Sequence, residues 1–370
     1  MIYVFYNNDP LAQDQGGGAE HFRALHRALL KSGLPFRLIA SRLQRHRRAP
    51  HVEYIAEGAS FPRYYLALWR WFWRNRHRFA PEDVFHFHRN YAAWPKFLLC
   101  RGRGRVLISY HNVTGRVLRG RLGPFAAPIR RLMLAFERRA VRRADALVCV
   151  SGRDRGELER LVANEPFARA EVIPAAFDAA LFAARPQGPP APELARRLLF
   201  LGRLSHQKNV GLAIATLEHL RQADEPWTLT IVGDGEEARQ LIRRIARSPV
   251  AAAIRWLGRV PHDRVVELFA THGILLLTSR YEASPTVVKE ALAAVRPVVS
   301  TDVGDVRDWI EEGVTGFVTE PDPRALAAAV RNASRLIAEG RCRRSTRLDS
   351  LAERQIMERV LHLYRELQAG

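Results

Sequence analysis

The sequence of 370 residues has few cysteines and no long apolar segment. Its three cysteines, Cys100, Cys149 and Cys342, are odd in number and include no CxxC pair, which argues against a disulfide framework and a structural zinc site. No apolar run approaches the ~18 residues that a membrane-spanning helix needs. The first residues lack the basic segment of a signal peptide, so we expect a cytoplasmic protein.

Acidic residues are scarce relative to basic ones. The chain has 58 Lys+Arg against 38 Asp+Glu, a formal net charge of +20. Residues 1–190 hold 32 basic and 15 acidic residues, net +17, whereas residues 191–370 hold 26 and 23, net +3. Positive charge concentrated on one half indicates a polyanionic partner there: nucleic acid, an anionic membrane or an acidic substrate.

Short β-branched or aromatic runs alternate with helical segments along most of the chain. The expected strands are 2–6, 36–40, 84–88, 106–110, 146–150 and 171–173, then 198–201, 228–232, 254–257, 274–278, 298–300 and 316–318. This alternation predicts parallel sheets with helices on both faces.

A Pro-, Ala- and Gly-rich stretch interrupts the alternation near its middle, as a linker would. The sequence therefore predicts the α/β class, with two Rossmann-like domains facing a cleft. We expect domains at 1–174 and 193–345, a linker at 175–192 and a helix at 346–370 that crosses back to the first domain. Ligands of such sheets bind outside the carboxyl ends of the strands, so the site is expected there.

Three consecutive glycines, Gly16–Gly18, follow the first expected strand and precede a helix. Glycines allow close approach of the backbone to a ligand, and the start of a helix attracts anions. A flexible loop without a ligand is the alternative. The segment is not GxGxxG, so a dinucleotide fingerprint is not supported.

Two cations, Arg203 and Lys208, follow the first strand of the second half. On a loop that opens a helix they would neutralise a diphosphate, although two solvated surface cations would give the same spacing.

The segment after the strand 274–278 carries two glutamates, Glu282 and Glu290. Ser284 is a natural N-cap and Pro285 a natural first helical residue, so a helix is expected to begin there with free amides. One carboxylate would then meet a sugar hydroxyl and the other a ribose diol. Alternatively, both are helix-start charges that interact with the helix dipole.

Together these segments resemble the retaining glycosyltransferases of family 4, which have the GT-B architecture. The resemblance covers almost the whole chain and is specific only as a combination. Besides the residues above it includes His111-Asn112, Ala144-Asp145 with Val150-Ser151, Val172-Ile173-Pro174, Val232-Gly233-Asp234-Gly235, Trp256-Leu257-Gly258-Arg259-Val260 and Gly313-Val314-Thr315-Gly316-Phe317.

The resemblance implies roles for the matching side chains. Arg203 and Lys208 would bind the diphosphate of a nucleotide-sugar donor and stabilise it as leaving group. Glu290 would hold the ribose hydroxyls and Glu282 the transferred sugar. His111 would lie near the reacting sugar, so the implied catalytic residues are His111, Glu282, Arg203 and Lys208.

The resemblance also implies contacts made mostly by the backbone. The segment Ser284-Pro285-Thr286-Val287 would face the sugar and the phosphates. Gly17 and Gly18 would approach the phosphate from the first domain, and the base would lie near Gly258 and Val260.

No Asp-x-Asp motif is present. Two cations and a helix N-terminus can carry the charge of the leaving group in place of a divalent ion, so we expect no metal and no cofactor besides the nucleotide-sugar co-substrate. Front-face attack by an acceptor hydroxyl would retain the configuration of the sugar without a protein nucleophile.

The chain departs from the family pattern at several positions. They are Asn112 after the histidine, Ala175-Ala176 after Ile-Pro, Ala294-Val295 after the glutamate helix and Asp305 after Gly304. These changes flank the expected sugar pocket, so they would alter donor choice or weaken activity.

Two stretches of the basic half combine apolar and cationic side chains. In residues 64–79, a core-facing stripe of Tyr65, Leu68 or Trp69, Phe72 and Phe79 would leave Tyr64, Trp71 and Trp73 beside arginines. Residues 116–143 place Leu132, Phe136 and Ala140 on one helical face among arginines that begin with Arg116, Arg119 and Arg121.

Such helices are typical of membrane interfaces, so we expect the first domain to bind an anionic leaflet; a thickly packed helix is the alternative. No base-reading module is present, so nucleic acid is not expected.

The predicted function is retaining, metal-independent transfer of a hexose from a nucleotide-diphosphate sugar to a glycan or lipid-linked acceptor. It would take place at the cytoplasmic membrane face, in cell-surface polysaccharide or lipopolysaccharide synthesis. The alternatives are a sugar-phosphate-using synthase of the same family and a catalytically silent module that binds sugar nucleotides or membranes.

Overall fold

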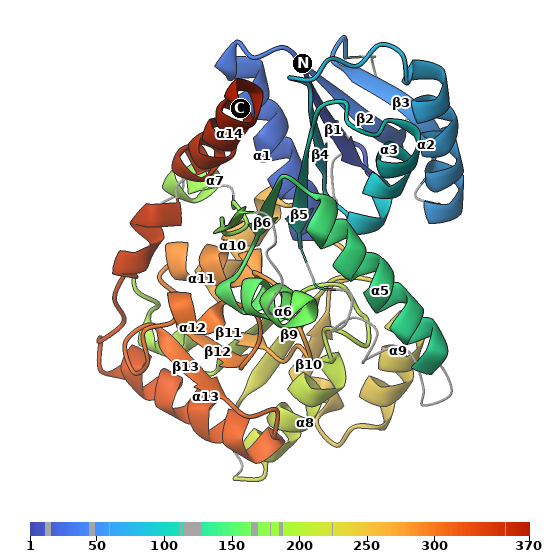
Figure 1. Ribbon diagram of the computed structural model, residues 1–370. Helices are drawn as coiled ribbons and strands as arrows, with labels where there is room; N and C mark the ends of the chain where they lie inside the picture. Colours follow the sequence, from blue (N-terminus) through green and yellow to red (C-terminus); the bar gives the residue numbers. More distant parts are fainter. Residues whose placement is uncertain are drawn as a thin grey trace. The chain divides into compact units, whose positions relative to one another are not determined.

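The computed structural model describes residues 1–11, 16–43, 49–58, 60–111, 113, 127–163, 169–177, 179–184, 188–223, 225–351 and 353–370. The chain forms two compact units, each built on a parallel sheet (Figure 1). The first unit contains Met1–Ala176 and Glu353–Gly370, and the second contains Phe177–Ala352. Most of the segment expected as a linker therefore belongs to the second unit.

The first unit contains a parallel sheet of seven strands. These are β1 (Ile2–Tyr6), β2 (Phe36–Arg42), β3 (Val52–Glu57), β4 (Val84–Phe87), β5 (Arg105–Tyr110), β6 (Ala146–Cys149) and β7 (Arg169–Val172), in the order β3-β2-β1-β4-β5-β6-β7. Its helices are α1 (Gly16–Ser32), α2 (Phe61–Asn75), η1 (Asn90–Ala93), α3 (Trp94–Leu99), α5 (Ala127–Arg143), α6 (Gly152–Val162) and α14 (Glu353–Ala369).

The central strands of this sheet are buried on both faces, as their nearly continuous apolar sequences require. Aromatic rings fill one side of it: Phe5 stacks on Phe87 at 4.6 Å and on Phe72 at 5.2 Å between ring centroids. The edge strand β3 was not predicted. Its side chains are only partly buried, so its sequence gives a weak apolar signal.

Helix α2 contradicts the predicted phase of its apolar stripe. The buried residues are Tyr64, Leu68, Trp71 and Phe72, whereas Tyr65 is only half-buried. Positions i, i+4, i+7 and i+8 lie on one helical face, so Tyr64 and Trp71 belong to the core. Tyr64 also donates a hydrogen bond to the carbonyl of Ile39. Of the three aromatics expected outside the core, Trp73 is exposed.

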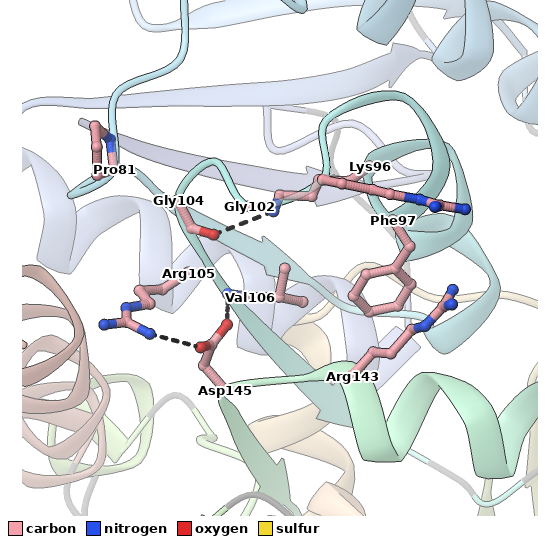
Figure 2. Close-up of a pocket in the computed structure, with 10 residues that line it drawn as sticks. Pro81, Lys96, Phe97, Gly102, Gly104, Arg105, Val106, Arg143 and Asp145 are labelled. Atoms are coloured by element: carbon pink, nitrogen blue, oxygen red, sulfur yellow. Dashed lines mark hydrogen bonds and ion pairs between the residues drawn. The ribbon is translucent and has the colours of Figure 1, made fainter.

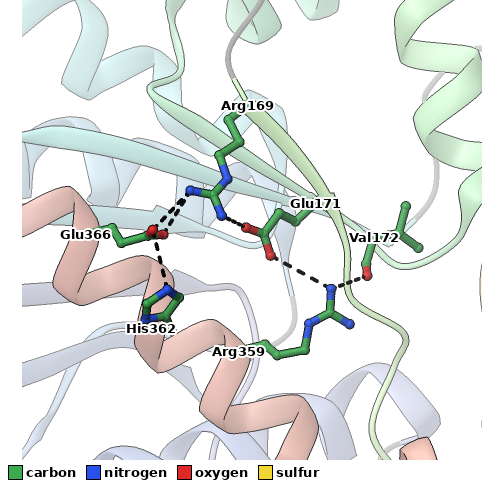
Figure 3. Close-up of polar contacts among 6 residues, drawn as sticks. All are labelled: Arg169, Glu171, Val172, Arg359, His362 and Glu366. Atoms are coloured by element: carbon green, nitrogen blue, oxygen red, sulfur yellow. Dashed lines mark hydrogen bonds and ion pairs between the residues drawn. The ribbon is translucent and has the colours of Figure 1, made fainter.

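Helix α14 packs on the first unit as predicted, and it lies beside α1 (Figure 1). Figure 3 shows its polar attachment to β7. Arg169 donates to Glu366 at 3.0 Å, and Arg359 donates to the carbonyl of Val172 at 2.9 Å. Within the core, the hydroxyl of Tyr364 lies 2.5 Å from His86 Nδ1.

The second unit contains a parallel sheet of six strands. These are β8 (Arg197–Leu201), β9 (Thr228–Val232), β10 (Ile254–Trp256), β11 (Ile274–Leu277), β12 (Val298–Thr301) and β13 (Gly316–Thr319), in the order β10-β9-β8-β11-β12-β13. Its helices are α7 (Ala179–Ala183), η3 (Pro192–Leu194), α8 (Val210–Arg221), α9 (Ala238–Arg247), η4 (Ala251–Ala253), α10 (Asp263–Thr271), α11 (Thr286–Ala293), α12 (Val306–Trp309), α13 (Pro323–Ala338) and η5 (Thr346–Leu351).

All six strands of this second sheet were predicted, within one residue at each end. Strand order reverses between β8 and β11, which places the loops after these strands on either side of a switch point. Ligands of open α/β sheets bind at such points. Across the described ranges, no helix combines the length and apolarity needed to span a bilayer.

Candidate functional site

Two glycine-containing loops meet at the carboxyl edge of the second sheet. Gly233, after β9, has φ +137°, and a Cβ there would lie 1.9 Å from the carbonyl oxygen of Gly202, after β8. The amide of Gly233 donates to the carbonyl of Gly258 at 2.7 Å. These loops can pack this closely only with glycine at position 233, and their contact fixes the backbone beneath the site.

Lys208 and Glu282 form an ion pair at this edge. Lys208 Nζ lies 2.6 Å from Glu282 Oε1, and both side chains are largely buried. Ser279 Oγ donates to the same carboxylate at 2.7 Å, and Gln207 Nε2 lies 3.3 Å from its other oxygen. The loops after β8 and β11 thus bring together two residues that the sequence analysis assigned to different parts of a donor.

Arg203, in contrast, is exposed and forms no ion pair with any residue that the structure describes. It follows Gly202 on the loop after β8, five positions before Lys208. One cation of the predicted pair is therefore available to solvent, and the other is neutralised by Glu282.

Helix α11 begins one residue later than predicted. Pro285 is its N-cap residue and Thr286 its first helical residue. The Ser284 hydroxyl does not cap the helix because it is engaged elsewhere: it donates to Asp305 Oδ2 at 2.6 Å and accepts from Lys289 Nζ at 2.7 Å. The first amides of a helix have no intrahelical acceptor, so Thr286 and Val287 can still donate to a ligand.

Glu290 lies in the second turn of α11 and is buried. Its Oε1 is 4.0 Å from Nε2 of His262, which precedes α10. Gly258, in the left-handed region at φ +67°, and the half-buried Val260 lie on the loop after β10. The second-unit residues predicted to bind a donor thus lie on the segments that follow β8, β10 and β11, with Glu290 inside helix α11.

A second ion pair, between Lys289 and Asp305, was not predicted from the sequence. Their nearest charged atoms are 3.9 Å apart, and both side chains are almost wholly inaccessible. Burial lowers the pKa of Lys289 to about 8, against the opposing effect of Asp305. Burial also raises the pKa of Asp305. In the sequence, the only indication of this pair was Asp305, which departs from the family pattern.

Another departure, Val295, adopts φ +57°, a conformation that disfavours β-branched residues. Ala175 and Ala176 are buried in the first unit, and the Ala176 amide donates to His21 Nδ1 at 3.3 Å. Asn112 lies outside the described residues.

The first unit places histidines at the carboxyl ends of β4 and β5. His111 follows β5 and is half-buried, and its Nε2 lies 3.0 Å from Nδ1 of the buried His88. His86, on β4, contacts Ser109 Oγ at 2.7 Å. Only His111 was predicted as a site residue; the alternation His86-Phe87-His88 along β4 was the signal available for the others.

Burial keeps these imidazoles neutral. It lowers the pKa of His86 to about 3 and those of His88 and His111 well below the usual range, with further lowering from neighbouring histidines. One nitrogen from each of His21, His88 and His111 lies within 4.8 Å of the other two, so these residues have the spacing of a metal site. Neutral imidazoles can equally orient a hydroxyl by hydrogen bonding.

Gly17 and Gly18 lie in the first turn of α1, not on the loop predicted for them, because the helix begins at Gly16. Their amides are still among the first of a helix, where anions bind.

Both halves of the chain match family models. Residues 15–181 match Glycosyltransferase Family 4, and residues 184–342 match Glycosyl transferases group 1. The glycogen synthase of Mycobacterium tuberculosis is 32% identical over 256 residues, which are 68% of this chain and 59% of that protein. The chain thus matches less than two thirds of the length of that relative.

Solved structures share the fold over nearly the whole chain. Sucrose-phosphate synthase from Thermosynechococcus elongatus has a TM-score of 0.80 at 20% identity, covering 100% of this chain and 99% of that one. Anabaena HepE in complex with UDP-glucose has a TM-score of 0.64 at 18% identity, covering 98% and 99%. With its two parallel sheets and these matches, the chain has the GT-B architecture, and both of its halves are related to glycosyltransferases.

Proposed function

We propose that the protein transfers a hexose from a nucleotide-diphosphate sugar to a glycan or lipid-linked acceptor, with retention of configuration and without a metal ion. The second unit would bind the donor and the first the acceptor. The observation that carries the proposal is the Lys208–Glu282 ion pair beside the unpaired Arg203, at the switch point of the second sheet.

This arrangement suits a charge exchange on donor binding. A diphosphate placed between Arg203 and Lys208 would compete with Glu282 for the lysine. The carboxylate, still held by Ser279, would then be free to accept a hydrogen bond from a sugar hydroxyl. Cations and helix amides can stabilise the departing diphosphate, so the chemical step requires no protein nucleophile.

The test is a thermal shift of the full chain with UDP, GDP, ADP and dTDP. A ligand that binds only the folded state raises the apparent Tm by mass action. We expect one nucleotide to stabilise the protein and the Arg203→Ala/Lys208→Ala variant to lose the effect. UDP is the first choice because the HepE structure contains UDP-glucose. Arg335→Ala, exposed at the end of α13, is the control and should behave as wild type.

Retention and the acceptor class need a second experiment. Turnover of the matching UDP-, GDP-, ADP- or dTDP-sugar would be followed by NMR of the anomeric proton in the product. An inverted product would contradict the retaining mechanism. Turnover with a sugar phosphate as acceptor would favour the synthase alternative, which the likeness to a sucrose-phosphate synthase makes worth testing. Nucleotide binding without turnover of any acceptor would favour the silent module.

The proposal also places the acceptor at an anionic membrane on the cytoplasmic side, and with it a role in polysaccharide or lipopolysaccharide synthesis. Helix α5 supports this part: Ile129, Leu132, Met133 and Phe136 recur at one-face spacing and are all exposed, among exposed arginines. The more N-terminal part of the predicted basic stretch, 116–126, lies outside the described residues.

Co-sedimentation with phosphatidylglycerol vesicles at low salt tests the membrane contact. Leu132→Ser/Phe136→Ser should weaken binding, whereas Leu66→Ser, on the exposed side of α2, should not. Wild-type protein that stays in the supernatant would remove the membrane from the proposal. Binding to duplex DNA with a steep salt dependence would instead favour nucleic acid as the polyanion.

A further inference from the structure

A cationic pocket lies at the amino ends of β5 and β6 (Figure 2), whereas His111 follows the carboxyl end of β5. It has a volume of about 510 Å³ and is built where Arg105 begins β5 and Asp145 precedes β6. Helix α3 contributes Lys96, and the last residue of α5 is Arg143. The family resemblance includes Asp145 but implies no role for it, and the proposed function does not use this end of the sheet.

The pocket holds more positive than negative charge. Its lining includes Lys96, Arg101, Arg105 and Arg143, with Asp145 as its acid. That carboxylate is already committed, because Oδ1 pairs with Arg105 at 3.1 Å and Oδ2 accepts from the Val106 amide at 2.7 Å. Across the described residues, Lys96, Arg101 and Arg143 form no ion pair with an acidic side chain.

Two of these unpaired cations are held in place by the fold. Lys96 is buried, and its Nζ donates to the carbonyl of Gly104 at 3.1 Å. The guanidinium of Arg143 lies 5.7 Å from the ring centroid of Trp94 and 6.0 Å from that of Phe97. Burial lowers the pKa of both, and for Arg143 the nearby Arg139 and Arg101 add to the lowering. An anion would relieve this accumulation of like charge.

The turn that closes the pocket is also fixed. Gly104 has φ +67°, and a Cβ there would lie 2.5 Å from the carbonyl oxygen of Asp83. Arg103, on the same turn, does not line the pocket. It is exposed and donates to the carbonyl of Arg76 at 2.9 Å, as a solvated surface arginine can. A buried ammonium and a guanidinium near two aromatic rings, both from residues that line one cavity, differ from the scattered cations of an arginine-rich surface.

We propose that this pocket binds a phosphate-bearing anion through Lys96, Arg101 and Arg143. Guanidinium and ammonium groups together suit the tetrahedral oxygens of a phosphate, and the volume leaves room for a group attached to it. The ligand is therefore a phosphate monoester, free or as a lipid headgroup. None of the residues that line the pocket is a predicted donor residue, so the site stands whether or not the proposed transfer reaction is correct.

Isothermal titration of the full chain with inorganic phosphate, at constant ionic strength, tests the site. We expect binding by wild type and a loss of affinity of about tenfold or more in Arg101→Gln/Arg143→Gln, because two charge-assisted contacts to the anion are removed. Arg103→Gln is the matched control and should bind as wild type. Arg101→Gln alone changes an exposed residue, so it keeps the test valid if the double variant misfolds.

Vesicles separate the two sources of phosphate. If the ligand is a headgroup, phosphatidic acid vesicles should bind more tightly than neutral phosphatidylcholine vesicles, and free phosphate and Arg101→Gln/Arg143→Gln should each reduce that binding. If the ligand is soluble, phosphate alone should bind and the substitutions should leave vesicle binding unchanged.

Absence of phosphate binding at millimolar concentration, or equal binding by all variants, overturns the proposal. The nucleotide thermal shift should not change in Arg101→Gln/Arg143→Gln, which separates this result from the donor test.

Discussion

The two units share a parallel-sheet design but place different electrostatics at the carboxyl ends of their strands. The second unit uses ion pairs, Lys208 with Glu282 and Lys289 with Asp305. The first uses imidazoles, His86, His88 and His111, which burial keeps uncharged. An ion pair can release its carboxylate when an anionic ligand binds the cation. Neutral imidazoles can accept or donate hydrogen bonds without carrying a charge. The difference suits a diphosphate on one unit and a hydroxyl acceptor on the other.

The largest expected effect comes from breaking the buried pair of the second unit. Lys289→Met would leave Asp305 buried without its cation and should lower the free energy of unfolding by about 3–5 kcal/mol. Lys289→Met/Asp305→Ala removes both charges and should recover most of the loss. Urea unfolding measures both, with Arg341→Met in the exposed Arg341–Glu339 pair as control. Equal destabilisation by the single and double variants would show that the charges are not coupled.

The next effect concerns the Lys208–Glu282 pair. Lys208→Met should reduce kcat by about 10²–10³-fold, because a donor aimed at the leaving-group charge is lost. Glu282→Gln keeps the shape and the hydrogen bond from Ser279 but removes the charge. It should weaken binding of the donor's sugar but leave unchanged the increase in Tm caused by the nucleotide without a sugar. Should Lys208→Met retain full turnover, the charge-exchange model would be wrong.

Lowering the pH should destabilise the first unit. In the folded state His86 and His88 stay neutral, whereas in the unfolded chain they titrate near pH 6.5. The unfolded state therefore binds more protons below that pH, and stability falls as pH decreases. Each of these two histidines should lower the free energy of unfolding by about 2 kcal/mol between pH 7 and pH 5. Unfolding followed by tryptophan fluorescence at the two pH values checks this, and His86→Gln should reduce the dependence. A stability that is flat over this range would contradict neutral burial.

The smallest expected effect is a change in stability on substitution of the residues that follow two helices, one in each unit. Ala163, after α6, has φ +34° and is exposed, so Ala163→Gly should raise stability by about 1 kcal/mol. Val295, at φ +57°, is buried, so Val295→Gly would relieve similar strain but lose apolar contacts, with little net change. Thermal unfolding of both variants tests the contrast. A gain in Val295→Gly equal to that in Ala163→Gly would mean that the valine side chain contributes little packing.

Sequence reasoning predicted the fold well because strands buried on both faces have nearly continuous apolar sequences. It failed at β3, an edge strand with weak apolar signal, and at the phase of α2, where seven aromatic residues lie within 15 residues and more than one stripe can be drawn. Periodicity could not decide between Tyr64 and Tyr65, since that choice depends on which face meets the sheet.

The site was predicted as a set of residues but not as a set of contacts. Sequence spacing and resemblance identified Lys208 and Glu282 but could not show their pairing, because 74 positions separate them and only the sheet brings them together. The capping role of Ser284 was wrong because Asp305 and Lys289, from outside the local sequence pattern, engage its hydroxyl. Local rules predict caps only when no tertiary partner competes.

The crossing of α14 has a consequence for synthesis of the chain. The hydroxyl of Tyr364 meets His86 in the core of the first unit, yet 278 positions separate them. During translation the strands β1 to β7 emerge early, but the surface that α14 covers stays open until the entire second unit has been made. The first unit is begun first and completed last. A chain released before residue 353 would contain a complete second unit and an incomplete first one, with exposed apolar surface that favours aggregation.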